Sequence, residues 1–504
     1  MRRIRQMAVS SSTGPLAKTA VAGAIALLLS APALAGTTPV FDIGNLVVSV
    51  EGNGVEGATS GSYLDNQAAP LTLFQFSANG TSSANYVSAL VLPQTGSGSN
   101  SAVSGEYGSS SEGALQLSGD GRYLTIMGYG VNAAAFNANP TAYGTLTTDP
   151  TKPGALGQSG SLTGQGYTPV SRVAVTIDSN GTVDSSTTLY NVYNGNNPRS
   201  VYTADGSAFY VSGQGTSGDN TGGVFYAAKG AHSGTAITGL DTSSKSAAQD
   251  TRFVQVYNGQ LYVSADSKEG SGSNRDFIGT LGAAGATPTA LANGSNGPTE
   301  LSGFGNSGGT GKVTLTAAQA NGINSKGMTI NLSPEAYYFA AANTLYVADS
   351  GAPKNDSTGT VVGDGGLQKW VNSKADGSGT WTLEYTLASG LNLVANTSAS
   401  GTTGLLGLTG KVVNGQVELY ATNYTVGDTD QTYLYGITDS LSATSKANGE
   451  AFTQLAAAPV DSNFKGVSFA PTVLSASPVP EPAPLLMFSV GLAGLALLRR
   501  RQSR

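Results

Sequence analysis

The sequence predicts an all-β protein whose body is a single six-bladed β-propeller. Short apolar runs alternate with Asn-Gly, Asp-Gly and Gly-Gly turns, which is the signature of β-hairpins. One strand type recurs six times, and a partner strand missing near the N-terminus has a counterpart near the C-terminus. No convincing amphipathic helix is found between residues 36 and 479, so helices do not contribute to the expected body.

The recurring strand pairs across a tight turn with a strand that precedes it. Its six copies are 46–48, 124–126, 209–211, 261–263, 345–347 and 419–421. Five partner strands are expected at 114–117, 200–202, 253–256, 336–339 and 405–408. The first copy lies too near the start of the body to have a preceding partner, whereas 466–469 is left without one. Pairing of these two segments would close the ring and remove an open sheet edge.

Each blade is completed by two further strands. We expect third strands at 73–76, 172–175, 224–226, 277–280, 367–370 and 433–436. We expect fourth strands at 87–92, 187–189, around 237, 289–291, 382–385 and 452–455. The long irregular segment 292–333 leaves one alternative open, a seventh blade that would include a strand near Lys312.

Both ends of the chain have the composition of processing segments. Basic residues precede the apolar stretch 19–29 and an Ala-x-Ala motif at 33–35, which predicts a signal peptide over 1–35. The body is expected over 36–475. Residues 476–504 contain a Pro-rich linker, an uncharged stretch at 485–498 and an arginine cluster, which predicts a hydrophobic helix with its basic end in the cytoplasm.

The tail resembles the PEP-CTERM sorting signal, on the motif Pro480-Glu481-Pro482 followed by the apolar run and Arg499-Arg500-Arg501. The resemblance implies an exosortase-type membrane protease as partner, a transient transmembrane helix, and release at the cell surface or outside the cell. It also implies association with exopolysaccharide. The body resembles exported NHL-like and lactonase-like propellers through the short motif Leu-Tyr-Val-Ala-Asp at 345–349.

The body without its processing segments is acidic and poor in charge. Residues 1–35 and 483–504 hold eight of the 25 Lys and Arg, which leaves 17 basic against 31 acidic residues and a net charge of −14. An acidic surface argues against nucleic-acid partners, because their binding depends on neutralised phosphates. The chain has no cysteine, so disulfides and thiolate sites are excluded.

Catalytic motifs are missing from the sequence. The one histidine, His232, lies in a Gly-rich loop and is interpreted as a surface turn rather than a general base. Asp266 and Asp349 follow recurring strands in loops that could hold calcium, although Asx turns are the favoured interpretation. We expect no cofactor, with calcium left open.

One set of side chains at equivalent positions of the repeat is a stronger candidate for a functional site. Equivalent positions at the starts of the six partner strands are occupied by Glu112, Arg199, Arg252, Glu335, Thr403 and Lys465. Five of them are charged in a chain where charge is scarce, so we expect them to converge at one mouth of the central channel. Either they neutralise one another and seal the channel, or they line a pocket for an uncharged or zwitterionic ligand such as a sugar, with Tyr337 or Tyr338 as an aromatic wall.

Two classes of function follow. The favoured one is a non-catalytic, monomeric surface or matrix protein that binds polysaccharides or surface proteins. The alternative is a secreted propeller-type hydrolase or lyase in which Glu112 and Glu335 act as acid and base. A purely structural role on the cell surface stays open as well.

Overall fold

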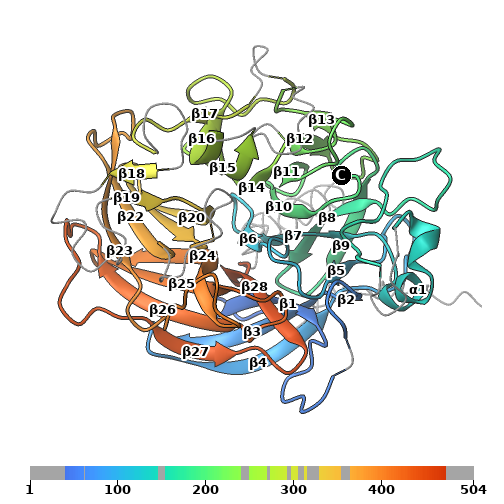
Figure 1. Cartoon of the computed structure of the whole chain (residues 1–504), viewed down its shortest axis with the longest axis horizontal. Coiled ribbons are helices and arrows are strands. Elements are labelled where there is room, and N and C mark those ends of the chain that lie inside the picture. The colour runs from blue at the N-terminus through green and yellow to red at the C-terminus, as the bar shows by residue number, and fades with distance from the viewer. Residues whose placement is uncertain are drawn as a thin grey trace, which may run out of the picture. The chain divides into compact units, whose positions relative to one another are not determined.

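The computed structural model describes residues 40–472, except for 62, 146–153, 240–248, 270–272, 292–296, 305–311, 315–328 and 353–363. Within this part of the chain, six antiparallel sheets are arranged around a central axis (Figure 1). The expected six-bladed β-propeller is therefore confirmed. The signal peptide expected over 1–35 and the sorting tail expected over 476–504 lie outside the described residues.

The blades share one plan, in which four strands follow one another from the axis outward. The innermost strands are β28 (Ser462–Phe469), β6 (Gln116–Leu117), β10 (Pro198–Tyr202), β14 (Thr251–Tyr257), β20 (Pro334–Ala341) and β24 (Thr402–Val413). The second strands are β1 (Leu46–Gly52), β7 (Tyr123–Tyr129), β11 (Ala208–Gly213), β15 (Gln260–Glu269), β21 (Thr344–Asp349) and β25 (Gln416–Thr425).

The outer half of each blade varies more in length. The third strands are β3 (Thr72–Asn79), β8 (Arg172–Asp178), β12 (Gly223–Ala228), β16 (Ser273–Leu281), β22 (Gly366–Asn372) and β26 (Tyr433–Ser440). The outermost strands are β4 (Ser83–Val91), β9 (Val183–Leu189), β13 (Thr235–Ala236), β17 (Thr299–Glu300), β23 (Trp381–Leu387) and β27 (Thr453–Ala457). The second blade also carries β2 (Ala68–Pro70) and β5 (Ser104–Glu106).

The ring closes as expected. Strand β28 pairs antiparallel with β1, in a register that sets Val47 opposite Ser468 and Val48 opposite Val467. The innermost strands contact one another in the order β28, β6, β10, β14, β20, β24 and again β28. This pairing leaves no free sheet edge between the first and last blades.

Two of the predicted turns between innermost and second strands have the hairpin conformation that their Asn-Gly sequence favours. Asn258 and Gly259 have φ values of +46° and +75°, and Asn414 and Gly415 have +52° and +79°. Two consecutive positive φ angles define the type I′ hairpin turn, which favours Asn-Gly. These two turns fix the register of β14 with β15 and of β24 with β25 at the tip of each pair.

Two details differ from the sequence-based expectation. Residues 289–291 form no strand, and Leu291 is 40% exposed. The outermost strand of the fourth blade is β17, in which Thr299 and Glu300 pair with Thr280 and Gly279. Strand β18 (Lys312–Thr314) exists, but it pairs with β19 (Thr329–Asn331) in an isolated two-stranded sheet rather than in a seventh blade.

Helical structure is confined to one short stretch in the described part of the chain. Helix α1 (Ala133–Ala138) begins after Asn132, whose side chain accepts a hydrogen bond from the backbone N–H of Ala135, and a 3₁₀ turn follows at Pro140–Tyr143. Among the described residues there is no helix with the length and apolar character needed to cross a membrane.

The two ends of the described body attach to the same rim of the second blade. The backbone N–H of Val40 donates to the carbonyl of Ser179, in the turn that follows β8. The backbone N–H of Thr472 donates to the carbonyl of Gly121, in the turn between β6 and β7. Both turns lie at the end of the blade where β6 finishes, because Tyr123 of β7 stands opposite Asp178 of β8.

Candidate functional site in the axial channel

The structure brings five of the six predicted side chains together. A cavity at the starts of the innermost strands, here named the charged chamber, is lined by Ser111, Glu112, Ala114, Arg199, Arg252, Phe253, Glu335, Ala336, Leu406, Gly407 and Lys465. Thr403 does not line it, because its hydroxyl donates to the carbonyl of Ser350 at 2.9 Å. The cavity measures only about 20 Å³, which is room for about one water molecule.

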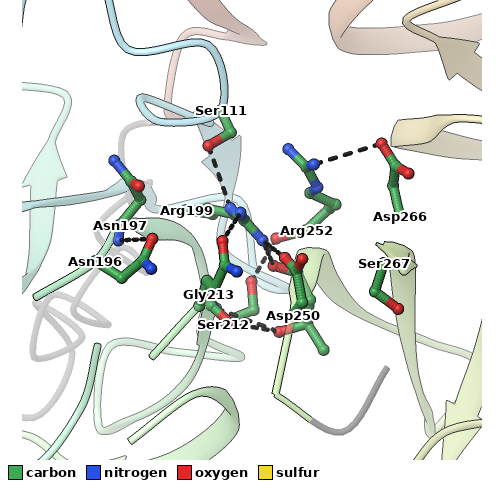
Figure 2. A network of polar contacts seen from close by, with 12 residues as sticks. Ser111, Asn196, Asn197, Arg199, Ser212, Gly213, Asp250, Arg252, Asp266 and Ser267 are labelled. Atoms are coloured by element: carbon green, nitrogen blue, oxygen red, sulfur yellow. Dashed lines mark hydrogen bonds and ion pairs between the residues drawn. The ribbon is translucent and has the colours of Figure 1, made fainter. Parts of the chain in front are cut away.

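Arg199 is held by a dense set of acceptors (Figure 2). Its guanidinium forms an ion pair with Asp250 and donates to the carbonyl of Thr251 at 2.8 Å. Further bonds reach Gln214 at 3.0 Å and Ser111 at 3.2 Å. Because the Arg199 side chain is only 4% exposed and its donors are used inside the protein, it has little capacity left for a ligand.

Arg252 lies between two carboxylates. Its terminal nitrogens are 3.4 Å from Asp266 and 3.4 Å from Glu335, and Figure 2 shows the contact with Asp266. The Asp266 carboxylate also accepts a hydrogen bond from the hydroxyl of Ser333 at 2.9 Å. Arg252 therefore bridges the innermost strands of the fourth and fifth blades by way of Glu335.

Lys465 occupies the closing strand β28. Its ammonium donates to the carbonyl of Ser109 and lies 3.9 Å from Glu51, a residue of β1 that sequence reasoning missed. Neither carboxylate oxygen of Glu51 has a hydrogen-bond partner among the described residues. Because Lys465 lies on β28 and Glu51 on β1, this ion pair joins the two strands that close the ring.

The backbone near the point where the ring closes is crowded. A Cβ atom on Gly466 would lie 2.2 Å from the backbone nitrogen of Leu115, and one on Gly113 would lie 2.7 Å from Cβ of Lys465. Only glycine permits the innermost strands of adjacent blades to approach so closely.

Three glutamates in this region have raised pKa values. Burial raises the pKa of Glu51 well above its usual value, which Lys465 opposes and Glu112 reinforces. Burial and then Glu112 raise the pKa of Glu106, which accepts a hydrogen bond from the backbone N–H of Gly157. Burial also raises the pKa of Glu112, against hydrogen bonds donated by Tyr129 and Asn197.

A larger cavity occupies the other half of the channel, along the second halves of the innermost strands. This uncharged chamber measures about 240 Å³. Its walls consist of Leu115, Gln116, Leu117, Ser118, Gly119, Tyr202, Phe253, Gln255, Val256, Tyr337, Tyr338, Leu408, Thr409, Gly410, Ser468 and Phe469. None of these lining residues is an acid, a lysine, an arginine or a histidine.

The predicted aromatic wall belongs to this second chamber. Tyr337 and Tyr338 do not line the charged chamber, because they lie two and three residues beyond Glu335 along β20. Phe253 lines both chambers and lies between them on β14, next to Arg252. The charged positions and the aromatic positions thus lie at different depths of one channel.

The remaining candidates take structural roles. His232 is exposed, and its Nδ1 shares a 2.7 Å hydrogen bond with the hydroxyl of Thr188 on the outermost strand of the second blade. Asp349 forms an Asx turn by accepting from the backbone N–H of Gly351 at 2.9 Å. Asp266 pairs with Arg252 instead. Within the described residues no group of three or more acidic or histidine side chains has an arrangement suited to a metal ion.

Comparisons with known proteins do not assign the chain to a family. No family model and no curated protein matches the sequence. A polysaccharide lyase, the PL25 ulvan lyase, is 8% identical with a TM-score of 0.31 over 69% of this chain and 73% of its own. The β-propeller domain of the Trilobed protease from Pyrococcus furiosus is 7% identical with a TM-score of 0.24, over 76% of this chain and 97% of its own. Neither score carries an argument about function.

Proposed function

We propose that this protein is an exported cell-surface or matrix β-propeller that binds a neutral, hydroxyl-rich ligand, such as a sugar residue, without catalysis. The ligand would occupy the uncharged chamber rather than the charged chamber. The observation that carries the proposal is the lining of that chamber, which combines aromatic faces with amide and hydroxyl groups and has no formal charge.

The lining matches the chemistry of a sugar ring. Tyr338 and Tyr202 provide aromatic surface for the apolar face of a pyranose, while Gln255, Ser118 and Thr409 provide polar groups for hydroxyls. The volume of about 240 Å³ lies below the ~300–1,000 Å³ of pockets for drug-sized molecules, which favours one sugar residue or the end of a chain.

One buried acceptor in the wall favours a ligand that donates hydrogen bonds. The amide nitrogen of Gln116 donates to the carbonyls of Val201 at 2.8 Å and Val254 at 3.0 Å, which fixes the side chain. Its Oε1 is buried and has no partner among the described residues. An unpaired buried acceptor is unfavourable, and a ligand hydroxyl would satisfy it.

The geometry gives less support to a hydrolase or lyase. General acid–base catalysis needs titratable groups within hydrogen-bond reach of the substrate. Glu112 and Glu335 line a chamber of about 20 Å³ that has no room for a sugar, and the larger chamber has no carboxylate or imidazole in its wall.

The export half of the proposal comes from the two ends of the sequence. The signal-peptide pattern over 1–35 and the Pro480-Glu481-Pro482 motif with its arginine cluster support processing by an exosortase-type protease. Exopolysaccharide made for the cell surface would then be the natural source of the ligand. Calcium and other cofactors have no assigned place in this proposal.

Titration calorimetry of the mature body against neutral monosaccharides and disaccharides, with uronic acids alongside, tests the proposal. We expect neutral sugars to bind, and Tyr338→Ala to weaken binding at least tenfold. Tyr86→Ala, which removes an exposed tyrosine from the outer strand β4, is the control and should leave the affinity unchanged. Preference for uronic acids, or turnover that Glu112→Gln abolishes, would contradict it.

A further inference from the structure

A second buried cluster lies between the fifth and sixth blades, away from the channel. Lys369 on β22 and Asp439 on β26 face one another, with 3.0 Å between Nζ and Oδ2. Their side chains are 0% and 2% exposed, so neither charge is solvated by water. The two groups are therefore held by each other and by their hydrogen-bond partners in the protein rather than by water.

Tyrosines immobilise the pair. The hydroxyls of Tyr346 and Tyr385 both donate to the Asp439 carboxylate. The two rings also flank the amine, with Lys369 Nζ at 5.5 and 5.4 Å from their centroids. The cluster is therefore a rigid, aromatic-lined site that holds one nitrogen against one carboxyl group.

The hydrogen bonds of Lys369 leave one direction for reaction. Its Nζ donates to the carbonyl of Ser440 at 2.6 Å and to the hydroxyl of Tyr385 at 3.1 Å. The third N–H of Nζ is directed at Oδ2 of Asp439, so a proton transfer within the pair would bring an unprotonated nitrogen against the carboxyl group. A nitrogen held against a carboxyl group in this way is the arrangement that nucleophilic attack requires.

A third ionisable group completes the site. Burial, and next the charge of the nearby Asp439, raise the pKa of Glu450 to about 7. Its Oε2 accepts a hydrogen bond from the backbone N–H of Ala447 at 3.1 Å. The Oε1 atom of Glu450 is buried without a hydrogen-bond partner among the described residues. An ion pair that already has its hydrogen bonds gains nothing from an additional carboxyl group, whereas amide formation requires a group that moves protons.

We propose that Lys369 and Asp439 become joined by an intramolecular amide bond in the folded protein. Nζ of the neutral amine attacks Cγ of the protonated Asp439, while the Tyr346 hydroxyl stabilises the oxygen that becomes negative. Glu450 gives its proton to the departing hydroxyl and takes one from Nζ. The N–C bond forms, a C–O bond breaks, and one water molecule leaves, so no oxidant, metal or cofactor is needed.

The amide bond would be a covalent cross-link in a chain that cannot form disulfides. The sequence has no cysteine, so no disulfide can link the blades. An amide between β22 and β26 would tie the third strands of adjacent blades together. It would lie in the ring, and unlike a disulfide it would resist reduction.

Mass spectrometry of the purified mature protein tests the bond directly. Amide formation removes water, so we expect an intact mass about 18 Da below that of the processed sequence, and a branched peptide that contains both Lys369 and Asp439 after digestion. Lys369→Arg and Asp439→Ala should each restore the full mass. Glu450→Gln keeps the shape of the side chain and should also leave the bond unformed or form it much more slowly.

An internal control uses a pair with the same spacing. Lys411 and Glu418 are also 3.0 Å apart, but their side chains are 44% and 20% exposed. Lys411→Arg should leave the 18 Da deficit unchanged. Full mass and separate peptides for Lys369 and Asp439 in the unsubstituted protein, even after prolonged incubation at 37 °C, would show that the pair is only an ion pair and overturn the proposal.

Discussion

The two chambers of the axial channel are built by the same innermost strands and yet differ in almost every property. At the strand starts, Arg199, Arg252 and Lys465 are paired with carboxylates around a space of about 20 Å³. Farther along, an uncharged wall surrounds about 240 Å³. The difference indicates that charge in this channel closes it, whereas neutral polar and aromatic groups leave it open.

The physical reason lies in the cost of isolated charge. A buried guanidinium is tolerated only when carboxylates and carbonyls surround it, so the side chains converge until no space is left. Tyrosine, glutamine and threonine tolerate partial hydration, and a cavity between them can persist. The charged half of the channel therefore holds the innermost strands together by ion pairs, whereas the uncharged half keeps the volume in which we propose that a ligand binds.

The largest effect is expected from Arg252→Met. This substitution leaves Asp266 and Glu335 buried without their shared cation, and breaking a buried ion pair in this way costs ~3–5 kcal/mol. Unfolding by urea, followed by tryptophan fluorescence, measures the loss.

A matched substitution on the same strand sharpens the comparison. Gln255→Met alters the uncharged chamber three residues farther along β14, and we expect it to change the free energy of unfolding by about 1 kcal/mol or less because no charge is left unpaired. Equal losses for the two variants would mean that the chambers do not differ in how they stabilise the fold.

An intermediate effect is expected from Gly410→Ala. A Cβ atom at this position would lie 2.8 Å from the ring of Tyr338, so the ring must move within the uncharged chamber. Overpacking of this kind costs ~1–3 kcal/mol, and affinity for a neutral sugar should fall about tenfold by calorimetry. Gly166→Ala is the control, because a Cβ atom there meets no atom within 4 Å. An equal loss of affinity in this control would show that the effect of Gly410→Ala does not depend on Tyr338.

The last prediction concerns the dependence of stability on pH. Burial and Glu112 raise the pKa of Glu106 in the folded state above its ordinary value of 4.5. The folded protein therefore binds this proton more tightly than the unfolded chain, and the resulting stability is complete below pH 4.5 and is lost as pH rises through the folded pKa. Glu106→Gln keeps an acceptor for Gly157 and should make the decline in unfolding free energy above pH 4.5 shallower. A slope identical to that of the unsubstituted protein would be the contrary result.

Much of the fold was predictable because its turns are local. Asn258-Gly259 and Asn414-Gly415 specify hairpins by backbone conformation alone, and six copies of one strand reveal the repeat. Ring closure followed from an unpaired strand at each end. The expected strand at 289–291 was wrong because a short apolar run was given more weight than its position, and the fold places Leu291 at the surface.

The candidate site was predictable only in part. Positions equivalent in the repeat could be aligned, and five of the six do converge. The partners Asp250 and Glu51 could not be found in this way. Asp250 precedes β14 and Glu51 lies near the end of β1, a second strand, so neither shares a repeat position with the six. Tyr337 and Tyr338 were expected beside the charged residues, but they line the uncharged chamber. Two residues along a strand move a side chain by about 7 Å, which is enough to place it in another chamber.

The attachment of Val40 and Thr472 to the second blade also fixes an orientation. Both ends of the described body lie on the rim where β6 finishes, and Ser118 and Gly119 of the uncharged chamber lie on that rim too. Any attachment made through the segment that follows Thr472 would therefore approach the propeller at the rim that carries Ser118 and Gly119, and not at the rim of the charged chamber.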